Sequence, residues 1–139
     1  MDWVLLIGRV LFINVFLISA IGFHFVQRGM GVEYARGKGV PMPEFLVPFS
    51  GLLALAGAIL VALGLWADLG ALLLTAFIFP VALWMHPFWK EADPTAKMME
   101  QVQFTKDIAL GGAALALFSL FEQFGDEIGL TLGPTSLFG

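Results

Sequence analysis

The sequence predicts an all-α integral membrane protein, an antiparallel bundle of four transmembrane helices. Four apolar runs cover residues 3–25, 45–67, 69–89 and 102–121. Crossing about 30 Å of hydrocarbon takes about 20 apolar residues at a rise of about 1.5 Å each, so each run can cross once. The composition agrees, because 59% of the residues are hydrophobic and 13% are charged, with a mean hydropathy of +0.89. Soluble domains carry about 25% charged residues.

A single domain is expected for a chain of 139 residues. We expect a four-helix transmembrane domain over residues 1–121 and an extramembrane C-terminal tail over residues 122–139. The formal net charge is −4, and the sequence has no basic stripe, so nucleic-acid binding has no support. The chain contains no cysteine, which excludes disulfides and thiol redox chemistry of its own.

The first apolar run is interpreted as a retained transmembrane helix. It lacks a basic leader, is too long for a signal peptide and carries Arg9. At 100° per residue, Arg9, Asn14 and His24 fall within an arc of about 140°, which should face the bundle because ionisable groups in a span need partners. For Arg9 two structural roles are open. It can snorkel to the interface, or it can pair with Asp68 or Glu122 at the same end of the bundle.

The connections between the runs are short or contain turn signals. The loop over residues 24–44 is rich in glycine and could contain a short interfacial helix around residues 32–36. The second and third helices are joined only by the region around Asp68, which requires an antiparallel hairpin. Asp93 followed by Pro94 is typical of a helix start, so the fourth helix should begin near residue 94. The tail keeps several apolar residues and is expected to dock on another surface.

The charge distribution predicts the orientation in the membrane. The two longer loops hold all the basic residues outside the spans, and the opposite end holds none. Such a bias predicts that loops one and three are cytoplasmic and that both termini lie outside. The basic residues of the two loops are Arg28, Arg36, Lys38, Lys90 and Lys97.

Six polar residues from four helices should converge at the end of the bundle that carries loops one and three. Three interpretations are open. Two histidines and a carboxylate could hold a metal, or the histidines could ligate a haem, although no recognised ligand motif is present. The residues could form a hydrogen-bonded lock, with Lys106 paired to Asp107 or Glu44. They could also line a pocket for a lipid headgroup or a quinone. The six residues are His24, Glu44, His86, Gln103, Lys106 and Asp107.

The chain resembles the DoxX family of small four-helix membrane proteins over nearly its whole length. Gly8-Arg9 and the Gly-Val-Pro-Met-Pro stretch at residues 39–43 carry the resemblance in the first part. The stretch His-Pro-Phe-Trp at residues 86–89, followed by Gln-Phe-Thr-Lys-Asp at 103–107 and Gly111-Gly112, carries it in the second. Relatives often have Asn where this chain has Asp107. Many also have an acidic residue early in the second helix, where this chain reads Pro-Phe-Ser-Gly at residues 48–51.

The resemblance implies a multi-pass protein of a bacterial-type inner membrane. The family is named for a subunit of a thiosulfate:quinone oxidoreductase, and other members resemble partners of redox or oxidative-stress enzymes. The first hypothesis is a non-catalytic accessory subunit of a larger respiratory or redox complex, or a homo-oligomer, with no catalytic residues, metal or cofactor of its own. The second is a quinone-linked oxidoreductase component with a quinone near His24, His86 and Lys106. The third is a small transporter or lipid-binding protein that uses the polar arc of the first helix.

Overall fold

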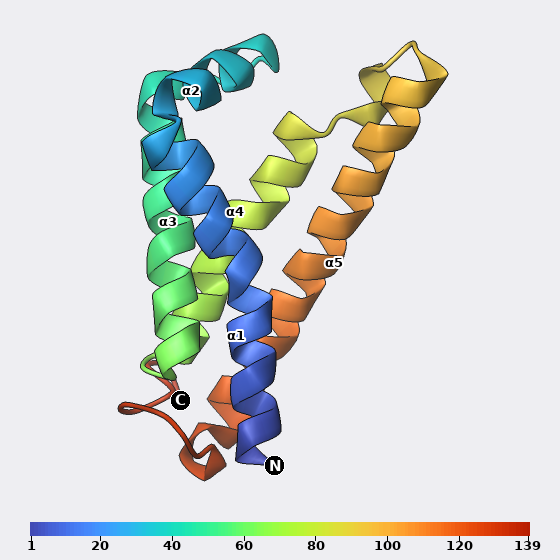
Figure 1. Cartoon of the computed structure of the whole chain (residues 1–139). Helices are drawn as coiled ribbons and strands as arrows, with labels where there is room; N and C mark the ends of the chain where they lie inside the picture. The colour runs from blue at the N-terminus through green and yellow to red at the C-terminus, as the bar shows by residue number, and fades with distance from the viewer.

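The computed structural model describes all 139 residues and is entirely helical (Figure 1). Four helical segments are long and apolar enough to cross a membrane. They confirm the predicted four-helix architecture, so the protein is a multi-pass membrane protein. The elements in chain order are α1 (Asp2–Ile18), the π-helical η1 (Ser19–Val26), α2 (Arg28–Gly37), α3 (Pro43–Leu63), α4 (Ala67–Met85), the short 3-10 turn η2 (Phe88–Lys90), α5 (Pro94–Phe124) and η3 (Gly125–Glu127).

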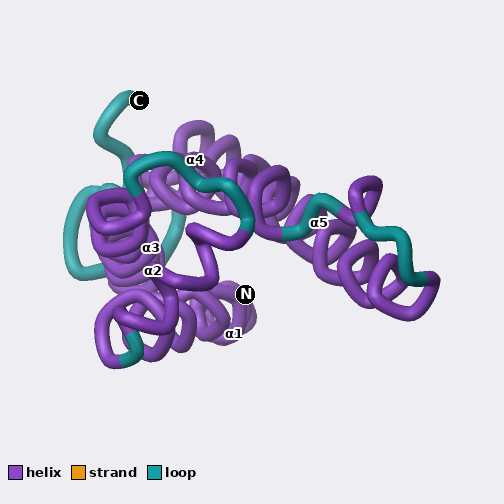
Figure 2. The backbone as a smooth tube through the Cα atoms, turned by 90° about the horizontal axis from the view of Figure 1, so that it is seen from above, coloured by secondary structure: helices purple, strands orange, loops and turns teal.

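The helices form a bundle that is open on one side. Helix α4 packs most extensively against α5 and α3, while α1 and η1 pack against α3. Helix α5 leans away from α1 towards the end that carries α2, as the side view and the view from above both show (Figures 1 and 2). Both termini lie at the opposite end, so loops one and three share one end of the bundle, as the sequence predicts. We call the end with α2 the loop face.

Small residues allow α3 and α4 to approach closely. A Cβ atom added at Gly57 would lie 2.8 Å from the carbonyl oxygen of Gly70 and 2.9 Å from the side chain of Leu74. Ala54 and Ala58 on α3 are also fully buried. In lipid, association of helices depends on such close packing because hydrocarbon offers no hydrophobic gain between helices. The α3–α4 hairpin is therefore the tightly packed centre of the bundle.

Two helix ends differ from the sequence expectation. Helix α3 stops at Leu63 rather than near residue 67, because Gly64 adopts the left-handed conformation (φ 67°) that ends helices. Helix α4 stops at Met85 rather than at residue 89. His86 precedes Pro87, and a residue before proline is disfavoured in the helical conformation; His86 accordingly has φ −123° and ψ 51°. The bend turns His86 out of the helix.

Two local predictions are confirmed. The interfacial helix of loop one is present as α2, and it is longer than the expected residues 32–36. Helix α5 begins at Pro94, and the Asp93 carboxylate accepts a hydrogen bond from the backbone N–H of Ala96 at 2.9 Å. This bond satisfies one of the free donors of the first turn.

The apolar tail docks on the chain's own helices. The N–H of Leu132 donates to the carbonyl of Leu63 (2.9 Å), and the N–H of Trp66 donates to the carbonyl of Pro134 (2.8 Å). The fully buried Asp68 carboxylate accepts bonds from Ser136 Oγ and from the backbone N–H groups of residues 137 and 138, at 2.7–3.0 Å. The tail therefore closes the end of the bundle opposite the loop face.

Arg9 takes neither of its two expected roles. It is 1% exposed, so it does not snorkel, and it forms no ion pair with Asp68 or Glu122. Its Nη2 donates instead to the backbone carbonyl of Leu130 in the tail, at 2.7 Å. Asn14 is exposed, so the expectation that it faces the bundle with Arg9 is wrong.

Replacing Gly57 by alanine tests the α3–α4 contact. The added methyl group meets a backbone carbonyl that cannot move independently, so the free energy of unfolding should fall by about 1–3 kcal/mol. The control is Gly8→Ala, because nothing lies within 4 Å of a Cβ atom at Gly8. Thermal unfolding in detergent measures both variants. Equal melting temperatures for the two variants would contradict the contact.

Candidate functional site

The structure divides the six predicted polar residues into three groups. His86, Gln103, Lys106 and Asp107 surround a cleft between α1, α4 and α5. His24 and His86 both line a separate cavity between η1, α2, α3 and α4. Glu44 belongs to neither space, because it forms an exposed ion pair with Arg36 on α2. Of the six residues, His86 is therefore the one that lines both spaces.

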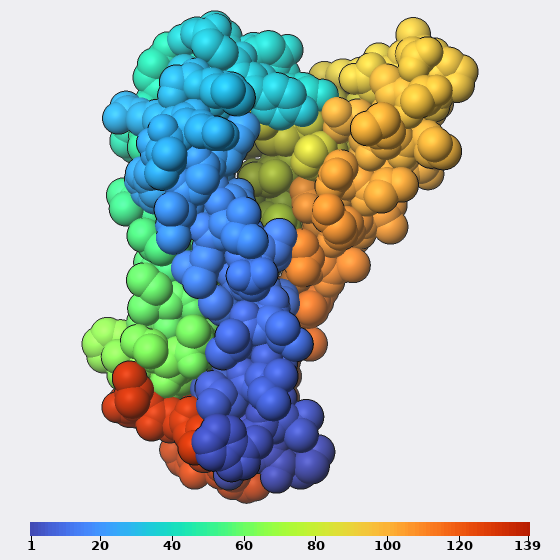
Figure 3. Space-filling model, viewed as in Figure 1, coloured from blue at the N-terminus to red at the C-terminus, as the bar shows by residue number.

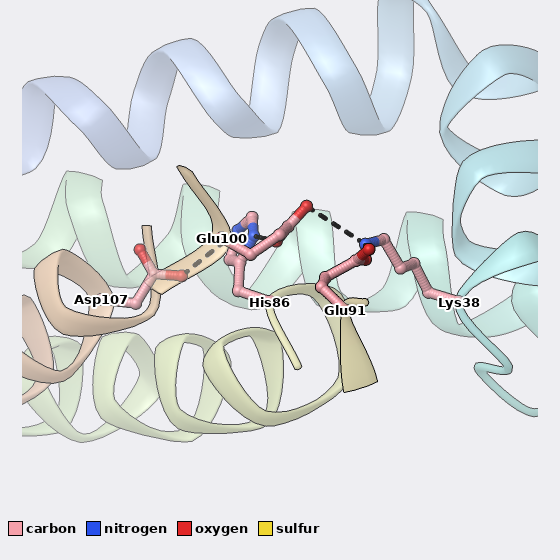
Figure 4. Close-up of polar contacts among 5 residues, drawn as sticks. All are labelled: Lys38, His86, Glu91, Glu100 and Asp107. Atoms are coloured by element: carbon pink, nitrogen blue, oxygen red, sulfur yellow. Dashed lines mark hydrogen bonds and ion pairs between the residues drawn. The ribbon is translucent and has the colours of Figure 1, made fainter. Parts of the chain in front are cut away.

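His86 lies at the centre of a polar network that spans three elements (Figure 4). Its Nδ1 lies 2.8 Å from Glu100 Oε2, and its Nε2 lies 3.6 Å from Asp107 Oδ2. The other carboxylate oxygen of Glu100 accepts a bond from Lys38 Nζ at 3.2 Å, and Lys38 Nζ lies 3.9 Å from Glu91. We call these five residues the loop-face network.

Local structure explains how the network residues meet. His86 leaves α4 where Pro87 prevents the helix from continuing. Glu100 and Asp107 are seven residues apart on α5, so they lie on one face two turns apart. Lys38 is the C-cap residue of α2, where a positive charge interacts favourably with the helix dipole.

Sequence reasoning missed three members of the network, namely Lys38, Glu91 and Glu100. One signal was available, because Glu100, Gln103 and Asp107 have the spacing of a single helix face. Lys38 gave no such signal, since its partner lies 62 residues away in the chain. Hydropathy does not encode which helix ends become neighbours in the folded bundle.

The environment of Lys38 favours its charged form. Burial works to lower the pKa of Lys38, but the hydrogen bond to Glu100 and the interactions with Tyr34, Glu100 and Glu91 outweigh it, so the pKa is raised. The side chains of Lys38 and Glu100 are 17% and 18% exposed, so water screens this pair less than it screens a surface pair. The pair ties α2 to α5 across the loop face.

The larger space is a cavity of about 390 Å³ with mainly apolar walls. Tyr34, Phe49 and Trp84 line it and are 43%, 44% and 46% exposed, so they form its rim. Aromatic residues of this kind concentrate at the membrane interface. The cavity thus opens to the surface through an aromatic rim near the loop face.

The polar wall of the cavity comes from η1 and α3. His24 Nδ1 lies 2.7 Å from the carbonyl oxygen of Val47, so Nδ1 carries the proton and Nε2 is left as an acceptor in the neutral ring. Ser50 Oγ lies 3.3 Å from the same His24 nitrogen. This proximity requires Gly51, because a Cβ atom there would lie 2.5 Å from His24 Cβ.

Helix α4 adds a further acceptor to the cavity wall. Ala76 and Pro80 both line the cavity. Pro80 has no N–H, so the carbonyl of Ala76 lacks its usual helical hydrogen bond. Backbone groups freed in this way are tolerated in a membrane protein where they line a cavity or find another partner.

The second space is a cleft of about 170 Å³ between α1, α4 and α5. Asp107 is 7% exposed, and its Oδ2 has no hydrogen-bond partner. Gln103 and Lys106 are exposed at the edge of the cleft. No group of three or more His, Asp or Glu side chains is arranged to hold a metal ion, so the geometry does not favour the metal hypothesis.

Replacing Lys38 by methionine should lower the free energy of unfolding by about 1 kcal/mol at neutral pH. Because the folded-state pKa of Lys38 is raised, its contribution is complete below the pKa of the unfolded lysine and disappears as the pH rises through the folded-state pKa. The difference between wild type and Lys38→Met should therefore persist at pH 7 and vanish well above pH 10.5, the ordinary lysine value. Thermal unfolding across this range measures it.

Two further variants complete the experiment. In Glu100→Gln, the Lys38→Met change should cost less than in the wild type, since the shared hydrogen bond is already weakened. Lys97→Met is the control, because Lys97 is exposed and forms no ion pair. A Lys38 effect equal to the Lys97 effect at pH 7 would contradict the network.

Comparison with known proteins agrees with the architecture. A family model described as DoxX matches residues 4–87, which is more than half of the chain. Nothing matches among the curated proteins or the solved structures. The matched region runs from α1 to the end of α4 and includes Arg9, His24 and His86, whereas α5 lies outside it. The chain is a membrane protein of the DoxX family.

Proposed function

We propose that the protein binds a neutral, lipophilic ring compound of the quinone class in the cavity between η1, α2, α3 and α4. We further propose that this chain is the quinone-binding subunit of a larger redox complex in a bacterial-type inner membrane. The observation that carries the proposal is the cavity itself, which combines apolar walls with hydrogen-bonding groups.

The cavity matches such a ligand in size and chemistry. Small-molecule sites measure about 300–1,000 Å³ and combine apolar walls with a few polar groups that fix orientation. Thirteen of the 18 lining residues are hydrophobic, and the remainder include serine, tyrosine and histidine side chains. The hydroxyl group of Tyr34 can donate to a quinone carbonyl, and His24 Nε2 and the carbonyl of Ala76 can accept from a quinol hydroxyl. The hydroxyl of Ser50 already donates to the carbonyl of Val47 at 3.0 Å, so its oxygen is available as an acceptor. No Lys, Arg, Asp or Glu lines the cavity, which favours an uncharged ligand.

A partner supplies the electrons in this proposal. The chain contains no cysteine and so has no thiol–disulfide couple of its own. Reduction of a quinone to a quinol takes up two electrons and two protons, and the electrons come from a redox enzyme docked on this chain. The protons can come from the loop face, which we propose to be cytoplasmic because it carries the basic residues of both loops.

A matched pair of alanine-to-leucine changes tests the cavity. Ala76 lines the cavity and is exposed, so Ala76→Leu places three additional carbon atoms at the cavity opening, and Ala56→Leu places the same atoms on an exposed surface of α3 outside the cavity. Binding of a short-chain quinone to the purified protein should weaken at least ten-fold in Ala76→Leu, corresponding to about 1.4 kcal/mol, and should not change in Ala56→Leu. Equilibrium binding of a radiolabelled quinone measures both. Unchanged affinity in Ala76→Leu would contradict the proposal.

The first hypothesis, a purely structural accessory subunit, remains a second candidate, and a separate observation favours it. Four small residues of α5 are exposed on a surface that no other helix covers, and a Cβ atom at Gly112 would meet nothing within 4 Å. Exposed small residues at helical spacing let a helix of another chain approach closely. The four are Ala109, Gly112, Ala113 and Ala116.

Ala116→Leu tests whether this surface holds a partner. The tagged protein is extracted from native membranes in mild detergent and analysed by native gel and mass spectrometry. A partner subunit that co-purifies at fixed stoichiometry with the wild type should be lost from Ala116→Leu, because the larger side chain separates the two helices. It should be retained by Ala56→Leu. A wild-type chain that runs alone contradicts this candidate and the proposed redox complex, whereas binding of a quinone in the cavity would still be tested by Ala76→Leu.

A further inference from the structure

The cleft between α1 and α5 is a space with apolar sides and a charged end. Helix α4 forms its floor, and the space-filling view shows the hollow beside α1 and α5 near the loop face (Figure 3). The apolar sides include Val15, Phe16 and Leu110, and Val15 is 41% exposed. The cleft shares a wall of four residues, Ser19, Phe77, Val81 and His86, with the cavity proposed for the quinone.

Two hydrogen-bond acceptors face each other at the charged end. Glu100 Oε2 lies 2.8 Å from His86 Nδ1, and in the neutral ring that carries its proton on Nδ1, Nε2 is an acceptor. His86 Nε2 lies 3.6 Å from Asp107 Oδ2, and this oxygen is buried without a hydrogen-bond partner. An unsatisfied buried acceptor costs about 1–3 kcal/mol, more when it is charged. Asp107 Oδ2 therefore has room for a donor that the chain does not place on it.

Carboxylates outnumber ammonium groups in the loop-face network, which favours binding of a cation. The loop-face network contains three carboxylates, Glu91, Glu100 and Asp107, against one ammonium group, Lys38, which lies on Glu100 and Glu91 rather than on Asp107 (Figure 4). Lys106 lines the cleft but is exposed, and it forms no ion pair with Asp107. A group that carries both N–H donors and a positive charge would satisfy Asp107 and His86 together.

We propose that this cleft binds the headgroup of a phospholipid that carries a primary amine. Its ammonium group donates to Asp107 Oδ2 and His86 Nε2 after a small side-chain adjustment, and its phosphate lies towards the exposed Lys106. The acyl chains run along the uncovered apolar surface between α1 and α5, past Val15. The cleft volume of about 170 Å³ suits a headgroup, while the chains stay in the bilayer.

The position of the cleft favours a lipid over a soluble amine. The cleft lies between α1, α4 and α5. Helices α1 and α5 diverge towards the loop face (Figures 1 and 2), so the space between them would face hydrocarbon. Its apolar sides would gain nothing from a short hydrophilic amine. The two spaces share His86, but α5 and Asp107 contribute only to the cleft, so variants of Asp107 test the lipid proposal apart from the quinone cavity.

Native mass spectrometry of the purified chain with added lipids tests the proposal. The probes are dioleoylphosphatidylethanolamine, its N-trimethyl analogue dioleoylphosphatidylcholine, which has no N–H donor, and dioleoylphosphatidylglycerol, which has no amine. The wild type should bind the ethanolamine lipid about ten-fold more tightly than either of the others, as expected for one charge-assisted hydrogen bond. Asp107→Asn should abolish this preference. Glu122→Gln, an exposed change on the same helix, should retain it.

A second variant covers the case in which Asp107→Asn does not fold. Val15→Trp fills the mouth of the cleft without touching a polar group, and it should weaken binding of the ethanolamine lipid about ten-fold. Equal affinity for the ethanolamine and choline lipids would overturn the proposal. A preference for the glycerol lipid would also overturn it, because such binding would depend on Lys106 alone. Competition by soluble phosphoethanolamine as strong as that by the ethanolamine lipid would overturn it too, because the ligand would then be a soluble amine.

Discussion

The structure depends on one constraint, that hydrocarbon offers no hydrogen-bond partner to a polar group, so the chain must supply its own. Arg9 and Asp68 are 1% and 0% exposed, and they lie at the end of the bundle opposite the loop face. Both find partners in the tail, Arg9 at the carbonyl of Leu130 and Asp68 at backbone and hydroxyl donors of residues 136–138. The tail is thus part of the fold rather than an appendage to it.

At the loop face, the need to satisfy polar groups within hydrocarbon applies as well, but there several of these groups line two open spaces. There η1 widens into a π-helix, a geometry often found at functional sites, and it presents His24 to the carbonyl of Val47 on α3. Pro48 frees the carbonyl of Glu44, which accepts from Arg28 at 3.4 Å, and Pro80 frees the carbonyl of Ala76 at the cavity wall. At the tail end, the chain itself supplies partners for Asp68 and for Nη2 of Arg9, whereas Nε and Nη1 of Arg9 are buried without one. At the other end, two spaces and an unpaired Asp107 remain for a ligand or a lipid.

Most of the fold could be predicted from the sequence, because hydropathy and helix-terminal residues act locally. The four spans, the start of α5 at Pro94 and the shared end of loops one and three all follow from such signals. The partners of Arg9 and His86 could not be predicted. Arg9 binds a backbone carbonyl, which no residue type reveals, and His86 contacts Glu100 because α5 packs against α4, an arrangement that hydropathy does not encode. The proximity of His86 and Asp107 was predicted, whereas the separation of Glu44 from them was not.

The most direct test of the quinone cavity is photoaffinity labelling of the purified chain with a photoreactive short-chain quinone, followed by peptide mapping. Label should concentrate on η1, α3 and α4 within residues 19–24, 46–53 and 76–86, and an excess of unlabelled quinone should prevent it. Label spread evenly over the exposed apolar surfaces of all helices, or label that unlabelled quinone does not displace, would contradict a binding site in this cavity.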